Sequence, residues 1–217
     1  MSTTLTLWGQ SAVTLDSERG RLTIDPGSLS DLACLDGASA VLITHAHVDH
    51  LDVDAVVKAV STNPALRVIA PADAVAQLKE AGASAERLET VGPGDHLTVV
   101  GHEVLAVGGE HMPIHEGIPT PANVGYLIDG RLLQPGDAFP ELPEGTGLEV
   151  LLLPVSAPWL RLAVAADYAL AVGAQRVIPI HDALLSDAGK SIHDNVVGNG
   201  VAVPGYERFA PGTLISL

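Results

Sequence analysis

The sequence predicts an α/β fold, and three observations support this. Short apolar runs that read as buried strands alternate with segments whose apolar residues have helical spacing. In three segments, 41–52, 131–137 and 176–182, His or Asp stands at the C-terminal end of an apolar run. Side chains at strand ends meet when the strands share one edge of a sheet. A sheet architecture therefore explains how these separate segments build one site.

The length and composition predict one domain over residues 1–217. The chain is 47% hydrophobic, which supports a substantial core. Its net charge of −15, from 26 acidic and 11 basic residues, argues against binding nucleic acid or an anionic membrane surface. A small-molecule substrate fits this charge even if it is anionic, because bound cations dominate the field of a metal site. The oligomeric state is left open.

The sequence also predicts a cytoplasmic location. Cys34 is the only cysteine, so there is no disulfide framework and a reducing compartment fits. The opening residues, M-S-T-T-L-T-L-W, lack the basic and long apolar regions of a signal peptide. No apolar run reaches the roughly 20 residues of a membrane span. We therefore expect no membrane partner.

Local patterns place the elements in order along the chain. The segments expected to contain strands are 4–15 (two strands around a Gly bend), 21–27, 41–44, 67–70, 97–100, 103–107, 124–129, 131–137, 148–154, 176–182 and the end of 205–217. A first helix is expected behind Asp52 as N-cap, with an apolar stripe every three to four residues. Two more helices are expected, one between Pro71 and Gly82 and one that ends at Gly173.

The segment from Val41 to Asp52 (V-L-I-T-H-A-H-V-D-H-L-D) concentrates four candidate metal ligands after an apolar strand. Side chains in an extended chain repeat every two residues, so His45 and His47 point to the same side and can share one ion. Asp49 and His50 lie where the chain turns and can face a second ion. Nitrogen and carboxylate ligands suit Zn²⁺, and also Mn²⁺ or Fe. The alternative interpretation is a polar loop in which the histidines are coincidental.

Residues 44–52 (T-H-A-H-V-D-H-L-D) resemble the H-x-H-x-D-H signature of the metallo-β-lactamase-fold hydrolases. The resemblance extends over nearly the whole chain and is to the small bacterial metal-dependent hydrolases more than to the antibiotic-cleaving enzymes. It implies a four-layer αββα sandwich of the metallo-β-lactamase type, with a dinuclear metal site at one edge of the two sheets. The implied cofactors are two divalent metal ions, with Zn²⁺ as the first choice. The family often has Gly-His where this chain has Gly9-Gln10, so any role of that histidine is absent.

The resemblance also assigns ligands to positions of this sequence. The implied ligands are His45, His47 and His111 for one ion, Asp49, His50 and His181 for the other, and Asp137 as the carboxylate that bridges both. Asp25 stands where the family has an Asp-Pro near the metal site, and it is either an outer group of the site or a turn aspartate. Trp159 either packs over the site or fills the core. His96 and His102 are expected to be solvated.

Two histidines, His111 and His115, follow a strand that we expect to reach a turn at Gly108-Gly109. His111 is nearer to the strand end and is the expected metal ligand. Pro113 stands between the two and disfavours a helix that would put both on one face. His115 then lies in a stiff, proline-rich loop that we expect to form a wall of the substrate pocket. There it either donates a proton or contacts substrate, or it is simply solvated.

The expected activity is that of a metal-dependent hydrolase. A bound metal lowers the pKa of its water from about 15.7 to about 7, and the resulting hydroxide can attack a small ester, lactone or phosphodiester. No protein nucleophile is then needed, and Asp49 and His115 are the candidate catalytic side chains. One alternative is a metal-dependent nuclease, which the acidic balance disfavours. Another is a redox or ligand-sensing metal protein on the same fold that hydrolyses nothing.

Overall fold

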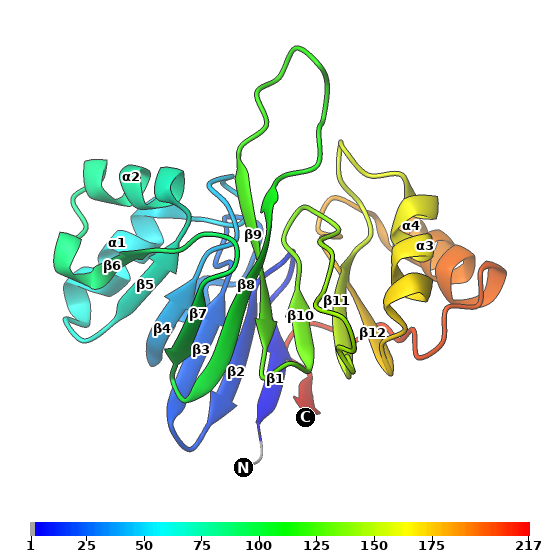
Figure 1. Ribbon diagram of the computed structural model, residues 1–217, viewed down its shortest axis with the longest axis horizontal. Coiled ribbons are helices and arrows are strands. Elements are labelled where there is room, and N and C mark those ends of the chain that lie inside the picture. Colours follow the sequence, from blue (N-terminus) through cyan, green and yellow to red (C-terminus); the bar gives the residue numbers. More distant parts are fainter. Residues whose placement is uncertain (1–2) are drawn as a thin grey trace.

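The computed structural model describes residues 3–217, in which two β-sheets pack face to face (Figure 1). The first sheet has seven strands, in the order β13 (Leu214–Ser216), β1 (Thr4–Leu7), β2 (Val13–Ser17), β3 (Gly20–Ile24), β4 (Ala38–Leu42), β5 (Arg67–Ala70) and β6 (Leu88–Thr90). The second has six, in the order β12 (Arg176–Ile180), β11 (Val150–Pro154), β10 (Leu132–Gln134), β9 (Ala122–Ile128), β8 (His102–Glu110) and β7 (His96–Val99).

Helices cover the outer face of each sheet, so the molecule has four layers (Figure 1). On the first sheet lie α1 (Val53–Thr62) and α2 (Ala72–Glu80), which share a core with β4 and β5. On the second lies α3 (Leu162–Val172), which packs on β11 and β12, with α4 (Asp187–Asp194) beside it. A third core fills the space between the sheets. The predicted αββα sandwich is therefore confirmed.

Short helical segments complete the chain. They are the 3₁₀ helices Leu32–Leu35 and Ala85–Arg87 and the π-helical segment Asn195–Gly200, which continues α4. The sequence analysis did not predict α4 or this continuation, because the segment is mostly polar. Within residues 3–217, no helix has the length and the apolar composition that crossing a membrane requires.

The first predicted helix forms for the predicted reason. The Asp52 carboxylate accepts a hydrogen bond from the backbone N–H of Ala55, which satisfies one of the free donors of the first turn. Val56 and Val60 of the apolar stripe are buried against the first sheet. The cap fixes where the helix starts and therefore how much chain separates it from β4. That short connection carries His45, His47, Asp49 and His50.

One prediction about the second sheet was wrong. Gly108 and Gly109 form no turn, because β8 continues through both of them to Glu110. Their φ angles are +83° and +146°, which side chains rarely adopt, and a Cβ on Gly109 would lie 2.9 Å from Cγ of Pro93. The glycines thus let the strand twist past a neighbouring proline. The chain leaves the sheet one residue before His111, at the base of the loop that projects in Figure 1.

His102 also differs from prediction, because its side chain is buried rather than solvated. Its Nδ1 lies 2.7 Å from an Oδ2 of Asp129, which gives the ring a polar partner inside the fold. His96, at the start of β7, is exposed as predicted. His102 begins β8 and Asp129 follows β9, so this pair lies at the edge of the sheet opposite to His111.

Strand direction brings the candidate ligands to one edge of the sandwich. In the first sheet β3 and β4 are parallel, so Asp25 and the segment that begins at His45 emerge side by side. In the second sheet β10 runs parallel to β11 and β12, and β8 has the same direction because each of β8 and β10 is antiparallel to β9. Their C-terminal ends therefore deliver His111, Asp137 and His181 together.

Strand β9 ties the two sheets together beneath this edge. The hydroxyl of Tyr126 is fully buried and donates a hydrogen bond of 2.7 Å to the backbone carbonyl of Ile43. The backbone N–H of Val124 donates to the carbonyl of Thr44 at 2.9 Å. Both acceptors lie between β4 and His45, so the second sheet directly supports the loop that the first sheet carries.

We predict that Gly27→Ala destabilises the fold at the metal loop. A Cβ at Gly27 would lie 1.9 Å from the carbonyl oxygen of Asp49 and 2.5 Å from the nitrogen of His50, so the loop backbone must shift. The expected loss in the free energy of unfolding is about 1–3 kcal/mol, as for other overpacked sites. Denaturant unfolding in a chelator measures this without a contribution from bound metal.

The matched control is Gly147→Ala, because a Cβ there meets no atom within 4 Å. Its stability should stay within about 1 kcal/mol of the unsubstituted protein. Equal stability for the two variants would show that the loop does not depend on the close approach of Gly27.

Candidate metal centre

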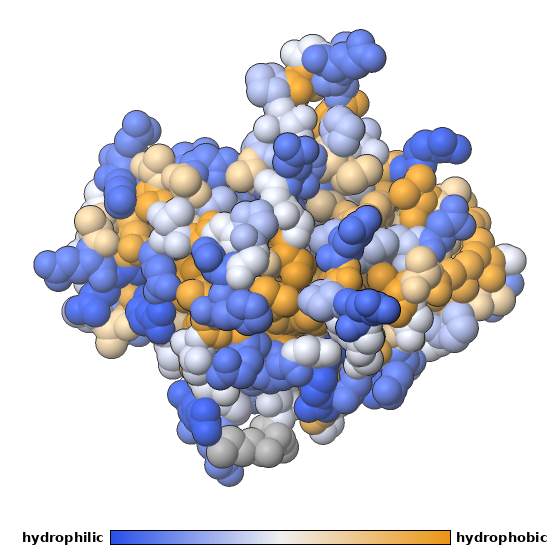
Figure 2. All heavy atoms as spheres, viewed as in Figure 1, coloured by the Kyte–Doolittle hydropathy of each residue, from blue (hydrophilic) through white to orange (hydrophobic). Residues whose placement is uncertain are grey.

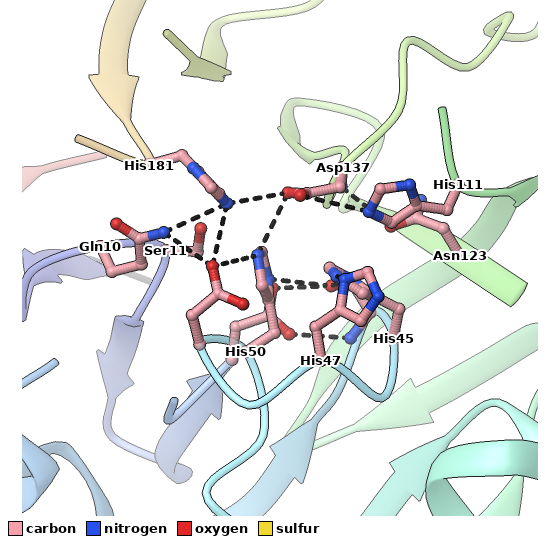
Figure 3. Close-up of polar contacts among 12 residues, drawn as sticks. Gln10, Ser11, His45, His47, His50, His111, Asn123, Asp137 and His181 are labelled. Carbon is pink, nitrogen blue, oxygen red and sulfur yellow. Dashed lines mark hydrogen bonds and ion pairs between the residues drawn. The ribbon is translucent and has the colours of Figure 1, made fainter. Parts of the chain in front are cut away.

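Seven side chains from both sheets converge into two adjoining groups at this edge (Figure 3). Within each group, one nitrogen or carboxylate oxygen per residue lies within 4.8 Å of the corresponding atoms of the others. The first group is His45, His47, His111 and Asp137, and the second is Asp49, His50 and His181. Every residue predicted as a ligand is in one of them. Their roles as ligands remain predictions.

The first group is built on the two-residue spacing of the motif. His45 Nε2 lies 3.0 Å from His47 Nδ1, so the two rings face a common point as predicted. The ring of His111 lies 5.0 Å from that of His45 and 4.8 Å from that of His47, centroid to centroid. His45 and His111 are buried, whereas His47 is half-buried. Three imidazoles around one point are a donor set typical of Zn²⁺.

The second group combines the turn of the motif with the end of β12. His181 Nε2 lies 3.2 Å from an oxygen of Asp49, and His50 Nε2 lies 3.7 Å from the same Oδ2. His50 is completely buried, and the Asp49 side chain is the more open of the two at 22% exposed. The second group therefore has a buried side and an open side.

Asp137 joins the groups, because its two oxygens face different histidines. Oδ1 lies 3.1 Å from His50 Nε2 and 3.2 Å from His181 Nε2. Oδ2 lies 3.3 Å from His111 Nε2. This is the arrangement that a carboxylate needs if it is to contact two ions at once.

Backbone carbonyls orient two of the rings. Nδ1 of His111 lies 2.5 Å from the carbonyl oxygen of Met112, and Nδ1 of His181 lies 2.6 Å from that of Ser156. A carbonyl oxygen only accepts hydrogen bonds, so Nδ1 carries the proton in both rings. The lone pair of each neutral ring is then on Nε2, which points into the cluster. Fixing the tautomer through the other ring nitrogen is how proteins prepare histidine ligands.

Asp25 orients His50 in the same way and is not a free turn residue. Its Oδ2 lies 2.8 Å from His50 Nδ1, and its Oδ1 accepts from the backbone N–H of Thr44 at 2.8 Å. The carboxylate is fully buried, and the residue has a left-handed φ of +51°. Such a conformation is costly for a residue with a side chain, and these hydrogen bonds offset the cost. Of the two readings of Asp25, the structure supports the outer group of the site.

The donor atoms fit a bound cation. Three of them, His50 Nε2, His111 Nε2 and Asp137 Oδ1, are buried without a hydrogen-bond partner in the part of the chain that the structure describes. Buried polar atoms are rarely left unpaired, and each needs a physical explanation. When the histidines are neutral, the set presents only lone pairs and carboxylate oxygens, which are the complement of a positive ion. The chemistry of the set therefore agrees with the metal prediction.

The pKa shifts in the ion-free chain follow from the same crowding. Burial lowers the pKa of His45, and the charge on His50 lowers it further. Burial also opposes a charge on His181, but hydrogen bonds with Asp137 and Asp49 outweigh it and raise the pKa of His181 to about 9. For Asp137, burial would raise the pKa, yet the charge on His50 and hydrogen bonds from the histidines hold it well below its usual range. The carboxylates thus favour positive charge inside this cluster.

Two residues of the site, Asn123 and Gln10, were missed as such by the sequence analysis, and for Trp159 it left two readings open. Asn123 is fully buried, its Oδ1 accepts from the backbone N–H of Asp137 at 2.9 Å, and its Nδ2 donates to the carbonyl of Pro135. Trp159 Nε1 donates to Asp137 Oδ2 at 2.7 Å, so Trp159 packs at the site rather than only filling the core. Gln10 contacts Asp49 and His181. A single amide has no spacing pattern, so no local signal marks Asn123 or Gln10 as part of the site.

His115 lies outside both groups. It is exposed on the loop between β8 and β9, where its Nδ1 accepts a hydrogen bond from the backbone N–H of Gly117 at 3.0 Å. The structure thus separates it from His111, which is buried at the base of the same loop. Its role as a proton donor remains a prediction.

Comparison with known proteins gives the same family from sequence and from fold. The family described as "Beta-lactamase superfamily domain" matches residues 4–181. Protein Rv0786c of Mycobacterium tuberculosis is 36% identical over 195 residues, which are 87% of this chain and 88% of that protein. The residues that match the family include all seven members of the two groups.

Two solved structures show how widely the fold is used. Igni18, a metallo hydrolase from the archaeon Ignicoccus hospitalis, superposes with a TM-score of 0.74 at 19% identity, over 100% of this chain and 99% of that one. CmlA, a diiron β-hydroxylase from Streptomyces venezuelae, superposes with a TM-score of 0.73 at 15% identity, over 99% of this chain and 54% of that one. At these identities the likeness is one of fold.

We predict that divalent metal binding at pH 7 releases protons. The raised pKa values of His181 and His50 mean that both rings carry a proton in the ion-free chain at neutral pH. A metal ligand must be a neutral imidazole, so binding displaces about one to two protons per chain, and affinity weakens as the pH falls. Calorimetric titration with Zn²⁺ in buffers of different ionisation enthalpy counts the released protons. Binding without proton release would mean that these histidines are not the ligands.

Proposed function

Because this chain belongs to the beta-lactamase superfamily of metal-dependent hydrolases, we propose that it cleaves a small ester, lactone or phosphodiester with a pair of divalent metal ions. The observation that carries the proposal is the position of Asp137 between two groups of ligands. Each oxygen of this one buried carboxylate faces a different group. A site for a single ion would not need that arrangement.

The chain offers a separate donor set for each ion. His45, His47 and His111 would hold one, Asp49, His50 and His181 the other, and Asp137 both. The histidine-rich donors suit Zn²⁺ best, and Mn²⁺ or Fe use the same donor types. When bound, two such ions supply an activated water at neutral pH and polarise the scissile carbonyl or phosphoryl group.

The remaining task of the protein is to position charge and substrate. Asp49 is the most open carboxylate of the cluster, and hydrogen bonding with His181 and the charge on His50 lower its pKa even though burial would raise it. It therefore stays ionised and can accept a hydrogen bond from a reacting water on the open side. Trp159 holds the other carboxylate, Asp137, through its indole N–H. These contacts support a catalytic role for Asp49. They support a role for Asp137 as a carboxylate held in one orientation for the ions.

The loop between β8 and β9 is the proposed wall of the pocket. It projects beyond the sandwich, and in the space-filling view it carries both hydrophilic and apolar side chains (Figures 1 and 2). Ile114 and Ile118 are 38% and 48% exposed there, next to the exposed His115. A small substrate with an apolar part could contact the isoleucines, and His115 could then protonate its leaving group.

A second candidate function is metal-based redox chemistry. The donors of the cluster also suit iron, and the fold is shared with the diiron β-hydroxylase CmlA. That neighbour has much additional chain beyond the superposed part. A nuclease is the weaker alternative, because the net charge of −15 leaves few residues to neutralise phosphates. We expect no complex with DNA or RNA.

We predict that Asp137→Ala loses most of the hydrolytic activity while the protein stays folded. Loss of the shared carboxylate should release or misplace one ion and remove several kcal/mol of transition-state stabilisation, which is about a hundredfold or more in rate. Turnover of chromogenic phosphodiester, lactone and thioester substrates by the Zn²⁺-, Mn²⁺- and Fe-loaded protein identifies the bond and measures the loss.

The matched control is Asp129→Ala, which removes another strand-end carboxylate that contacts a histidine, at the opposite edge. This variant should keep most of its activity. The proposal fails if Asp137→Ala turns over like the unsubstituted protein, or if no metal-loaded form hydrolyses any of these substrates.

A further inference from the structure

We propose that Gln10 is a positioning residue that sets the second group of ligands, Asp49 and His181, in place for its ion. The inference rests on the pair of ions proposed above, and it concerns a residue to which the metal motif assigns no part. Gln10 lies in the turn between β1 and β2, and its side chain reaches into the cluster (Figure 3). Only 3% of the residue is exposed.

The direction of the Gln10 amide is fixed by one hydrogen bond. Its Oε1 accepts from the backbone N–H of Ala183 at 3.0 Å. A backbone N–H can only donate, so the oxygen must occupy this position and the NH₂ group must face the cluster. Gln10 therefore presents donors, and not an acceptor, to the ligands.

The NH₂ group contacts two ligands of the second group. Nε2 donates to Asp49 Oδ2 at 2.8 Å and lies 3.1 Å from His181 Nε2. Because Nδ1 of His181 donates to the carbonyl of Ser156, the neutral ring that a metal needs has its lone pair on Nε2, facing the cluster. An ion would take over this lone pair and leave Asp49 as the partner of the amide. Gln10 thus holds the Asp49 carboxylate through its amide, and this contact remains when an ion binds.

The backbone of Gln10 acts on His181 as well. The carbonyl of Gln10 accepts a hydrogen bond of 2.8 Å from the N–H of His181. Both residues have left-handed φ angles, +43° for Gln10 and +59° for His181, which are unusual for residues with a side chain. Strained conformations of this kind persist where the surroundings over-determine them, and they gather at functional sites. The turn that carries Gln10 and the end of β12 that precedes His181 are therefore held together next to the second group.

A neutral amide suits this task better than a charged donor. A lysine or arginine in its place would neutralise Asp49 and repel a divalent ion. The amide fixes the direction of the carboxylate and leaves its negative charge for the ion. Within residues 3–217, Gln10 makes no hydrogen bond with His45, His47 or His111, so its effect should be confined to one of the two ions.

The variant Gln10→Asn tests this proposal, because it should keep the conformation of the turn while moving the amide out of reach of Asp49. Asparagine accepts the left-handed φ of this position more readily than glutamine does, so the turn should still form. Its side chain is shorter by one methylene, about 1.5 Å, and cannot span from Ala183 to Asp49. The matched control is Gln134→Asn. Gln134 is fully buried and donates to the same turn, at the carbonyl of Ser11, but within residues 3–217 its side chain makes no hydrogen bond to a ligand.

The measurement is a Zn²⁺ titration of the metal-free proteins in competition with a chromophoric chelator, which needs no substrate. In Gln10→Asn, one of the two dissociation constants should rise about 10- to 100-fold while the other stays within about twofold. In Gln134→Asn both constants should stay within about twofold, even though the melting temperature falls. Circular dichroism of the metal-free proteins checks folding. If Gln10→Asn does not fold, Gln10→Met keeps the length without the amide and should give the same selective loss.

Two results would overturn the inference: Gln10→Asn binds both ions as tightly as the unsubstituted protein, or it weakens both equally. These outcomes are distinct from failure of the proposed function. An unsubstituted protein that binds two ions but cleaves no ester, lactone or phosphodiester would refute the hydrolase and leave the effect of Gln10 on metal binding to be judged by the titration alone.

Discussion

The buried carboxylate of Asp137 is the constraint on which the rest of the structure depends. An isolated charge is very costly inside a protein, so a cation or a set of donors must compensate it. Here three histidines face its two oxygens, and the indole of Trp159 donates to one of them. Even the preceding residue is restricted. Gly136 has a φ of +65°, and a Cβ there would lie 2.3 Å from the side-chain oxygen of Asn123. The chain around Asp137 is therefore built to hold this charge in one place.

Holding the charge requires both sheets at once. The first sheet supplies His50 and the second supplies His181, and both face the same Oδ1. The hydroxyl of Tyr126 on β9 donates a hydrogen bond to the carbonyl of Ile43 below the cluster. This bond holds the two sheets, and with them His50 and His181, at a fixed separation. A ligand that binds only the folded state stabilises it. Metal bound between the groups would therefore also strengthen the packing of one sheet on the other.

The sequence predicted those parts of the site that repeat a pattern. His45 and His47 follow from the two-residue period of an extended chain, and Asp52 follows from its position before a helical stripe. The predictions that failed concern features that depend on contacts between residues far apart in the sequence. The pair Gly108-Gly109 resembles a turn locally, but its pairing with Val124 and Asn123 of β9 makes it part of a strand. Gln10 reads as the loss of a histidine, yet its amide reaches ligands 39 and 171 positions away.

The most direct test of the account is the position of the metal itself, from anomalous diffraction at the zinc edge on crystals of the Zn²⁺-loaded protein. The account predicts two peaks, about 3.5–4 Å apart, one on each side of the Asp137 carboxylate. One should be surrounded by His45, His47 and His111, and the other by Asp49, His50 and His181. A single peak, or two peaks of which only one touches Asp137, would contradict it.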